Sequence, residues 1–290
     1  MNAPIDRVSS MMVMRMAEHC YHSLPQVSWA QLVDFLDSPQ LYYKRHVLND
    51  PAWRVKPNDV ADFRNSCHEA ILVHKDATKG YCIIPNKVLS ASGARAGKAW
   101  KEWEAQNRGV AHFKSYEVAP WNAMWRSIQE CGPANDLLLA EHPGSLEERT
   151  ILWDCNGVGL RCRIDRVIPG RAIVDLKTCA NADLNAIGRE IETRKLFIQA
   201  AFCQQGWQEA ADEKLDFIFV FVEKYAPFRT VCVTIDAAWL EVGMEKFHTG
   251  LQRLQACFNA DDFSDPICKT VHKLAQPTAA NLKSELVEEK

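Results

Sequence analysis

The sequence predicts an α/β fold with a central mixed β-sheet flanked by helices and a helical N-terminal part. Three neighbouring runs of strand-like residues are separated by the turn signals Asn156-Gly157 and Pro169-Gly170. A segment of helical length, 195–211, separates these runs from two further strand-like runs. Helix-like patterns also occupy much of the chain before residue 143. Together these observations indicate one sheet with helices around it.

The N-terminal half is expected to be helical. Ser28 is a good N-cap for a helix through about Asp37, whose apolar residues form a stripe at helical spacing. Ser38-Pro39 then interrupts or restarts this helix. Further helices are expected at 60–75 and 94–106, where Trp100 and Trp103 share a face, and another lies within 120–143.

The sheet is expected to begin near residues 150–154 and to continue through 159–168 and 171–178. After the long helix, 216–222 is typical of a buried strand, 229–236 alternates as another strand, and 237–258 is helical. We therefore expect a single domain over 28–264, preceded by an N-terminal extension, 1–27, and followed by a mobile C-terminal tail, 265–290.

Composition is that of an ordinary globular protein. The 290 residues are 47% hydrophobic and 24% charged, with a formal net charge of −3. The eleven cysteines are scattered, odd in number and without a CxxC pair, which argues against a disulfide framework, a zinc site or a clustered iron–sulfur site. The apolar run at 11–16 is short and contains Arg15, so it predicts neither a membrane span nor a signal peptide. The expected location is the reducing cytoplasm.

Three charged residues on the predicted strands indicate a chemical site. Asp175 and Lys177 point the same way, because residues i and i+2 of a strand share a face about 6.5 to 7 Å apart. If the preceding strand pairs through the Pro169-Gly170 turn, Asp165 lies near Asp175. Two such carboxylates repel unless a cation compensates, and Mg²⁺ typically uses one or two carboxylates with waters and phosphate. The alternative is a solvated Asp175–Lys177 ion pair on an exposed strand face.

The same residues resemble a known family. Ile164-Asp165-Arg166, then Ile173-Val-Asp-Leu-Lys-Thr178 and Phe197-Ile-Gln-Ala-Ala-Phe202, are similar to the PD-(D/E)XK nuclease superfamily. The likeness is closest to the RecE-type (exonuclease VIII) and lambda-exonuclease-like enzymes of phage recombination. It covers roughly residues 28 to 235 and is strongest from 148 to 207. The resemblance implies a restriction-endonuclease-like core.

Roles for the three charged residues follow from this resemblance. Asp165 and Asp175 would be the metal-binding carboxylates, and the Leu176 carbonyl would be a further ligand. Lys177 would position or polarise the attacking water and offset charge on the phosphate. The implied cofactor is Mg²⁺, with Mn²⁺ as an alternative, and two metals could activate the water and stabilise the leaving oxygen.

Three further positions match the family more loosely. His68 lies in a segment similar to the helix carrying the family's histidine, and Glu148 fits its upstream acidic position. Gln199 matches the glutamine of the family's Gln-x-x-x-Tyr element, but Cys203 stands where the tyrosine would be. Each has another explanation: His68 could be structural, Glu148 could belong to a Ser-x-x-Glu capping box, and Gln199 could be a polar residue on an apolar helix.

DNA contacts would need a local basic patch, because the net charge is slightly negative. Two groups could supply it. The first lies beside the carboxylates and comprises Arg161, Arg163, Arg166 and Arg171; the second comprises Lys98, Lys101 and Arg108. Either group could instead be an ordinary solvated face.

The resemblance implies a Mg²⁺-dependent exonuclease that degrades linear double-stranded DNA from its ends, 5′ to 3′, in recombination or repair. It also implies a homo-oligomeric ring and a single-strand-annealing recombinase as partner, with no membrane association. The alternatives are a PD-(D/E)XK endonuclease and an inactive DNA-binding relative. The chain has no Gly-x-Ser-x-Gly or Gly-x-x-x-x-Gly-Lys-Ser/Thr element, so serine hydrolase and P-loop ATPase functions find no support.

Overall fold

A computed structural model describes residues 12–53, 71–72, 81–108 and 110–271 of the chain. Within this part, the main sheet has the strand order β1-β5-β6-β7-β8-β9, and a short strand, β2, pairs with β6. Its strands are β1 (Met12–Arg15), β2 (Val27–Ser28), β5 (Leu146–Cys155), β6 (Val158–Ile168), β7 (Ala172–Cys179), β8 (Asp216–Glu223) and β9 (Thr230–Thr234).

The sheet is mixed, as predicted. β5, β6 and β7 form an antiparallel meander, whereas β7 and β8 pair in parallel. The β5–β6 turn is made by Asn156 and Gly157, both with positive φ, and the β6–β7 turn contains Gly170 at φ 73°. A parallel pair needs a long crossover, and α8 (Leu184–Thr193) and α9 (Leu196–Ala211) provide it. The α8 helix was not predicted.

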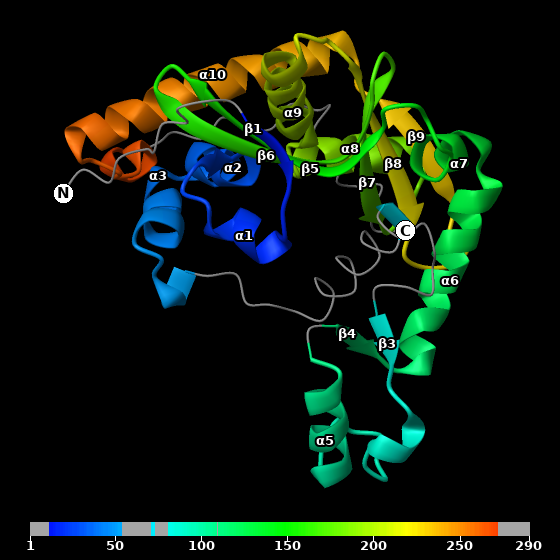
Figure 1. Ribbon diagram of the computed structural model, residues 1–290. Helices are drawn as coiled ribbons and strands as arrows, with labels where there is room; N and C mark the ends of the chain where they lie inside the picture. The colour runs from blue at the N-terminus through cyan, green and yellow to red at the C-terminus, as the bar shows by residue number, and fades with distance from the viewer. Residues whose placement is uncertain (1–11, 54–70, 73–80, 109, 272–290) are drawn as a thin grey trace.

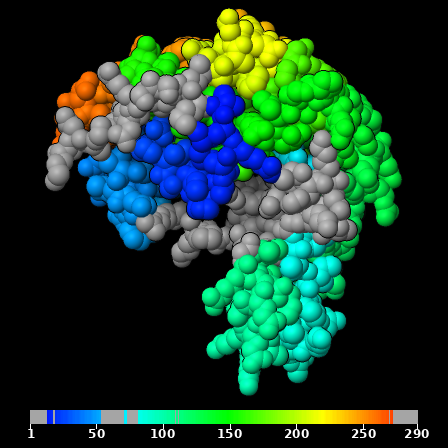
Figure 2. All heavy atoms as spheres, in the orientation of Figure 1, coloured from blue at the N-terminus to red at the C-terminus, as the bar shows by residue number. Residues whose placement is uncertain are grey.

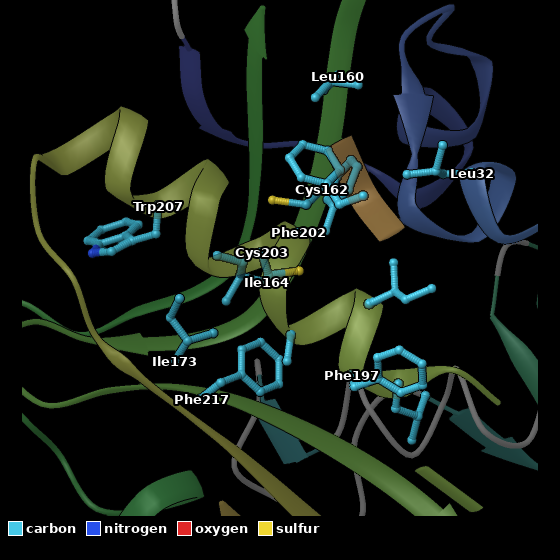
Figure 3. Packing of buried hydrophobic residues seen from close by; sticks show 14 of the residues in the cluster. Leu32, Leu160, Cys162, Ile164, Ile173, Phe197, Phe202, Cys203, Trp207 and Phe217 are labelled. Atoms are coloured by element: carbon cyan, nitrogen blue, oxygen red, sulfur yellow. The ribbon is translucent and has the colours of Figure 1, made fainter. Parts of the chain in front are cut away.

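Helices cover both faces of the sheet (Figure 1). One face packs against α9, α10 (Ala237–Ala260) and α2 (Trp29–Asp37), in a cluster that includes Ile164, Phe202 and Trp207 (Figure 3). The other packs against α6 (Ser115–Glu130) and α7 (Gly132–Leu138), in a cluster that includes Val174 and Leu176. The predicted core of a sheet between helical layers is therefore confirmed.

The N-terminal region joins the main sheet. β1 pairs antiparallel with β5 and β2 pairs in parallel with β6, so residues 12–28 are not separate from the domain predicted to start at residue 28. Between them lies α1 (Glu18–Ser23). Ser28 caps α2 as predicted, in a capping box with Gln31. After α2 come α3 (Pro39–Tyr42), a π-helix (Tyr43–Val47) and a 3-10 turn (Pro51–Trp53).

The C-terminal end of the described chain is attached to this region. A 3-10 turn, Pro266–Lys269, follows α10. The Ser38 hydroxyl donates a hydrogen bond to Asp265 at 2.7 Å, and Phe263 stacks on Tyr43. The structure therefore places residue 265, where the tail was predicted to begin, against the N-terminal helices.

A projection extends from the sheet and helices. Residues 81–114 form β3 (Tyr81–Ile83), a 3-10 turn (Asn86–Val88), α5 (Lys98–Gln106) and β4 (Ala111–Phe113), and we call this segment the arm. β3 and β4 pair with each other and not with the main sheet. Figures 1 and 2 show the arm standing away from the rest of the molecule. Of the helix expected at 60–75, all but residues 71–72 lies outside the described residues.

None of the described helices combines the length and the apolar character that crossing a membrane requires.

Candidate active site

Three acidic residues occupy facing positions on three adjacent strands. In the β6–β7 pair, Arg166 faces Val174, so the next facing positions are Asp165 and Asp175. In the β5–β6 pair, Glu147 faces Arg166 and Arg149 faces Ile164, which sets Glu148 opposite Asp165. All three acidic side chains are at least nine-tenths buried. The structure thus sets Asp165 opposite Asp175, as the strand pattern predicts, and sets Glu148, a candidate from the family resemblance, on the other side of Asp165.

Asp165 contacts the backbone of the neighbouring strand directly. Its Oδ2 accepts a hydrogen bond from the Leu176 amide at 2.8 Å. This contact lies just beyond the last paired positions of β6 and β7. It orients the Asp165 carboxylate toward β7, the strand that carries Asp175 and Lys177. The Leu176 carbonyl as a metal ligand stays a prediction.

Asp175 is held by two side chains. The Gln199 amide donates a hydrogen bond from Nε2 to Asp175 Oδ1 at 2.6 Å, and Lys177 Nζ forms an ion pair with Oδ2. Only 5% of the Asp175 side chain and 13% of the Lys177 side chain are exposed. These values exclude the alternative of a solvated surface pair. Lys177 Nζ also lies 5.8 Å from the centre of the Phe219 ring, an apolar neighbour from β8 that the sequence did not identify.

Glu148 occupies an irregular position in β5. Its φ is 52°, in the left-handed region that non-glycine residues rarely adopt, and its carboxylate forms an ion pair with Arg163. Because residues 146–155 form a strand, a helix capping box formed by Ser145 and Glu148 is wrong. Backbone strain at a non-glycine residue is common at functional sites, which is consistent with a role for Glu148 in the site.

Side-chain alternation reverses where Glu148 faces Asp165. In β6, Cys162, Ile164 and Val167 all face the α9 cluster, although a regular strand would place residues 164 and 167 on opposite faces. Arg166 therefore points to the other side of the sheet, where it bonds to the carbonyl of Leu137 at 3.1 Å. A regular strand would instead have placed Arg166 on the same face as Cys162 and Ile164.

The arginines predicted to bind DNA differ in accessibility. Arg166 is fully buried, and Arg161 is 3% exposed. The Arg161 guanidinium donates to the carbonyls of Leu24 and Gln26, holding the N-terminal segment against β6. Neither group is placed to contact a phosphate. Arg163 is partly exposed but pairs with Glu148, so its role is to balance that carboxylate.

Cys203, the residue in place of the family tyrosine, is buried beside the site. It lies one turn of α9 beyond Gln199 and is 1% exposed, and it packs in the cluster of Figure 3. A hydrogen bond with Cys162 and burial together raise the pKa of the Cys203 thiol. A neutral buried thiol is neither a nucleophile nor a metal ligand, so Cys203 supports the packing of α9 against β6. His68 lies outside the described residues.

The donor set suits a hard divalent cation. Among the described residues, no three His, Cys, Asp or Glu side chains form a group that could hold a metal by themselves. Mg²⁺ does not require such a group, because it commonly binds one or two carboxylates and completes its shell with water and substrate phosphate. Asp165 and Asp175 supply two buried carboxylates at facing positions, and oxygen donors of this kind favour hard divalent cations over softer metals.

Comparison with known proteins agrees with the fold and with the superfamily. Among solved structures, a crystal structure of "Putative exonuclease" from Eubacterium rectale is similar, with 15% identity and a TM-score of 0.57. The similarity covers 93% of this chain and 98% of that chain, and identity this low shows a shared fold alone. The curated proteins yield no match. A family model described as "PDDEXK-like domain of unknown function (DUF3799)" matches residues 28–275. The chain belongs to this PDDEXK-like family, within the PD-(D/E)XK nuclease superfamily.

Proposed function

We propose that this protein is a metal-dependent deoxyribonuclease that hydrolyses phosphodiester bonds of double-stranded DNA. One observation carries the proposal: Asp175 is buried opposite Asp165, and its two oxygens are held by Gln199 and Lys177. Buried carboxylates are costly unless a cation balances them. Two facing carboxylates with a single adjacent lysine leave negative charge for a divalent cation to balance.

Each residue has a defined part in this proposal. Asp165 and Asp175 would hold Mg²⁺, with Mn²⁺ as an alternative. Glu148, which pairs with Arg163 in the structure, would become a further ligand only by leaving that arginine. The metal would supply Lewis-acid stabilisation of the phosphate and a lowered pKa for a bound water. Gln199 fixes the orientation of the Asp175 carboxylate. Lys177 places a positive charge beside the reacting phosphate, where its Nζ stabilises the developing negative charge or orients the attacking water.

Exonuclease action is the more specific part of the proposal. It is supported by the sequence resemblance to RecE-type and lambda-exonuclease-like enzymes and by the fold shared with "Putative exonuclease". By that resemblance, the substrate is a linear duplex end degraded 5′ to 3′ in recombination or repair. A ring-shaped homo-oligomer and a single-strand-annealing recombinase as partner stay predictions.

The test is nucleotide release from end-labelled linear duplex DNA with Mg²⁺. The wild type should release nucleotides, and a chelator should abolish the release. Asp175→Asn and Lys177→Met should each lower the rate by about a hundredfold or more, the size of loss typical of a removed transition-state contact. Lys214→Met, at an exposed lysine between α9 and β8, is the matched control and should retain full activity. Wild-type protein that releases no nucleotide with either metal would contradict the proposal.

Covalently closed circular DNA separates the two modes of cleavage. An exonuclease should leave the closed circle intact and degrade the same DNA after it is linearised. If the closed circle is nicked or linearised and Asp175→Asn prevents this, the same site acts as an endonuclease.

A further inference from the structure

The arm carries a positive charge that the rest of the chain lacks. Its residues 81–114 include six lysines and arginines and two glutamates, a net charge of +4, whereas the whole chain has a net charge of −3. The remainder of the chain is therefore net negative. Figure 2 shows that the arm is also the part of the described molecule that projects farthest from the sheet and its helices.

The positive residues of α5 lie along one exposed face. Lys98 and Lys101 are one turn apart, and Arg108 follows Lys101 by seven residues, just after the helix ends. Lys98 and Lys101 therefore lie on one side of the helix, and Arg108 continues this basic row in the sequence beyond the helix end. All three are exposed. Trp100 points the other way, into the arm's own apolar cluster with Ile84 and Val88.

Aromatic side chains pack beneath this basic row. The Trp100 and Trp103 rings lie 5.5 Å apart, and the His112 ring packs on the edge of Trp103 at 4.8 Å. At the base of the arm, Phe113 is buried in the cluster beneath α6 and α7, with Tyr81 packed against it. The arm is thus anchored to the sheet that carries the site.

A phosphodiesterase site requires basic residues along the path of the DNA, because the phosphate backbone dominates affinity. The arginines nearest the carboxylates do not meet this need, since Arg161 and Arg166 bond to backbone carbonyls and Arg163 pairs with Glu148. On the arm, by contrast, Lys101 and Arg108 are exposed and form no ion pair with a described residue. Lys98 has only an exposed partner, Glu102, at 3.8 Å.

We propose that the basic row formed by Lys98 and Lys101 of α5 and by Arg108 just beyond its end binds the phosphate backbone of duplex DNA away from the cleaved bond. This inference rests on the proposed function, which supplies the choice of DNA over another polyanion. The arm supplies affinity and not chemistry, because α5 packs through Trp100 in a cluster separate from the strands that carry the carboxylates. It therefore acts on the binding of DNA and leaves the rate of cleavage of bound DNA unchanged.

The test compares two triple variants in an Asp175→Asn background, which prevents cleavage while binding is measured. The arm variant is Lys98→Gln, Lys101→Gln and Arg108→Gln. The control variant removes the same charge from exposed residues outside the arm, by Arg15→Gln, Lys214→Gln and Lys246→Gln. Fluorescence anisotropy with a labelled duplex measures the dissociation constant over a range of salt concentrations. Circular dichroism checks that each variant is folded.

The arm variant should bind DNA roughly ten- to a hundredfold more weakly at low salt, and the slope of log K against log salt should fall by about 2 to 3, close to one per lost phosphate contact. The control should change affinity by less than about threefold. A second arm variant, Glu102→Gln with Glu104→Gln, should tighten binding, since it removes the negative charges beside the row. Equal salt slopes for the arm and control variants would overturn the inference.

Two further readouts separate this inference from the proposed function. With Asp175 restored, the arm variant should show a raised KM for DNA and an unchanged kcat. A lowered kcat would contradict a role in binding alone. If the arm variant keeps its affinity for DNA but loses binding to polyglutamate, the surface belongs to an acidic protein and the inference is wrong. Failure of the proposed function would instead appear as wild-type protein that binds DNA through the arm but releases no nucleotide.

Discussion

The Asp165 carboxylate accepts a hydrogen bond from the Leu176 amide at 2.8 Å, so a side chain of β6 satisfies a backbone group of β7 where the pairing of these strands ends. Asp165 therefore has two functions, one in the fold and one in the proposed chemistry. Because a neutral amide oxygen can also accept a hydrogen bond, substitution separates these functions.

Asp165→Asn should leave the protein folded, with a free energy of unfolding within about 1 kcal/mol of the wild type, while nuclease activity is lost. Asp165→Ala leaves the buried Leu176 amide without this acceptor and should cost about 1 to 3 kcal/mol in addition to the activity. Urea denaturation and nucleotide release measure the two effects. An active Asp165→Asn variant would show that this carboxylate does not take part in the chemistry.

Gln199 is expected to act through Asp175. Its amide lies 2.6 Å from Asp175 Oδ1, so Gln199→Ala should free the carboxylate to rotate and lower kcat by roughly ten- to a hundredfold, the loss typical of a residue that orients a metal ligand. The metal concentration for half-maximal activity should rise as well, which a purely structural defect would not cause. Gln205→Ala, on the same helix but bonded to Glu209, is the control and should change neither quantity.

Glu223 is expected to make the free energy of unfolding depend on pH in the acidic range. The Arg229 guanidinium, together with hydrogen bonds from the Ala182 and Arg229 amides, lowers the pKa of this buried carboxyl to about 2 from its ordinary value of 4.5. Since the folded-state pKa is the lower one, the stabilisation is complete above about pH 5 and is lost as the pH falls toward 2.

The free energy of unfolding of the wild type should therefore decrease between pH 5 and pH 2 more steeply than that of Glu223→Gln, which has no carboxyl to titrate. Glu192→Gln, at an exposed residue of α8, should follow the wild type. Denaturation at several pH values measures the slopes. Parallel slopes for the wild type and Glu223→Gln would contradict the assignment.

Two helical glycines should respond in opposite ways to alanine. A Cβ at Gly243 would lie 2.5 Å from the Phe197 carbonyl oxygen, where α10 crosses α9, so Gly243→Ala should destabilise the protein by about 1 to 3 kcal/mol. Gly188 in α8 has open space around it, and Gly188→Ala should stabilise by up to about 1 kcal/mol through helix propensity. Melting temperatures measure both changes, and a stabilising Gly243→Ala would disprove the close approach of these helices.

The strands of the meander were predictable because local signals agreed with the final structure. Asn156-Gly157 suits a hairpin turn on conformational grounds alone, and the apolar run at 216–222 suits a buried strand. The two strands of the arm were missed because each has only three residues, too few to show alternation. β1 and β2 are also very short. Their positions are set by the partner strands β5 and β6 and not by their own sequence.

The site was predictable where regular strand geometry holds. Asp175 and Lys177 share a face because β7 alternates without interruption. Gln199 was a candidate only through the family resemblance, and its contact with Asp175 depends on how α9 packs on the sheet. Arg166 was wrongly grouped with the DNA-binding arginines because the alternation of β6 reverses near Asp165, which no periodic pattern can reveal. The burial of Arg161 was also hidden, because it depends on carbonyls of the distant segment 24–26.

The three facing carboxylates come from strands that are consecutive in the chain, and this has a consequence for how the site assembles during folding. Residues 146–179 can pair through two short hairpin turns, which close small loops and form quickly. Gln199 lies in α9, within the crossover between β7 and β8, and reaches Asp175 only when these parallel strands pair. This step is slower because it closes a long loop. We therefore expect the carboxylates to meet before the amide that orients Asp175 is in place, so that catalytic competence is gained at the end of folding.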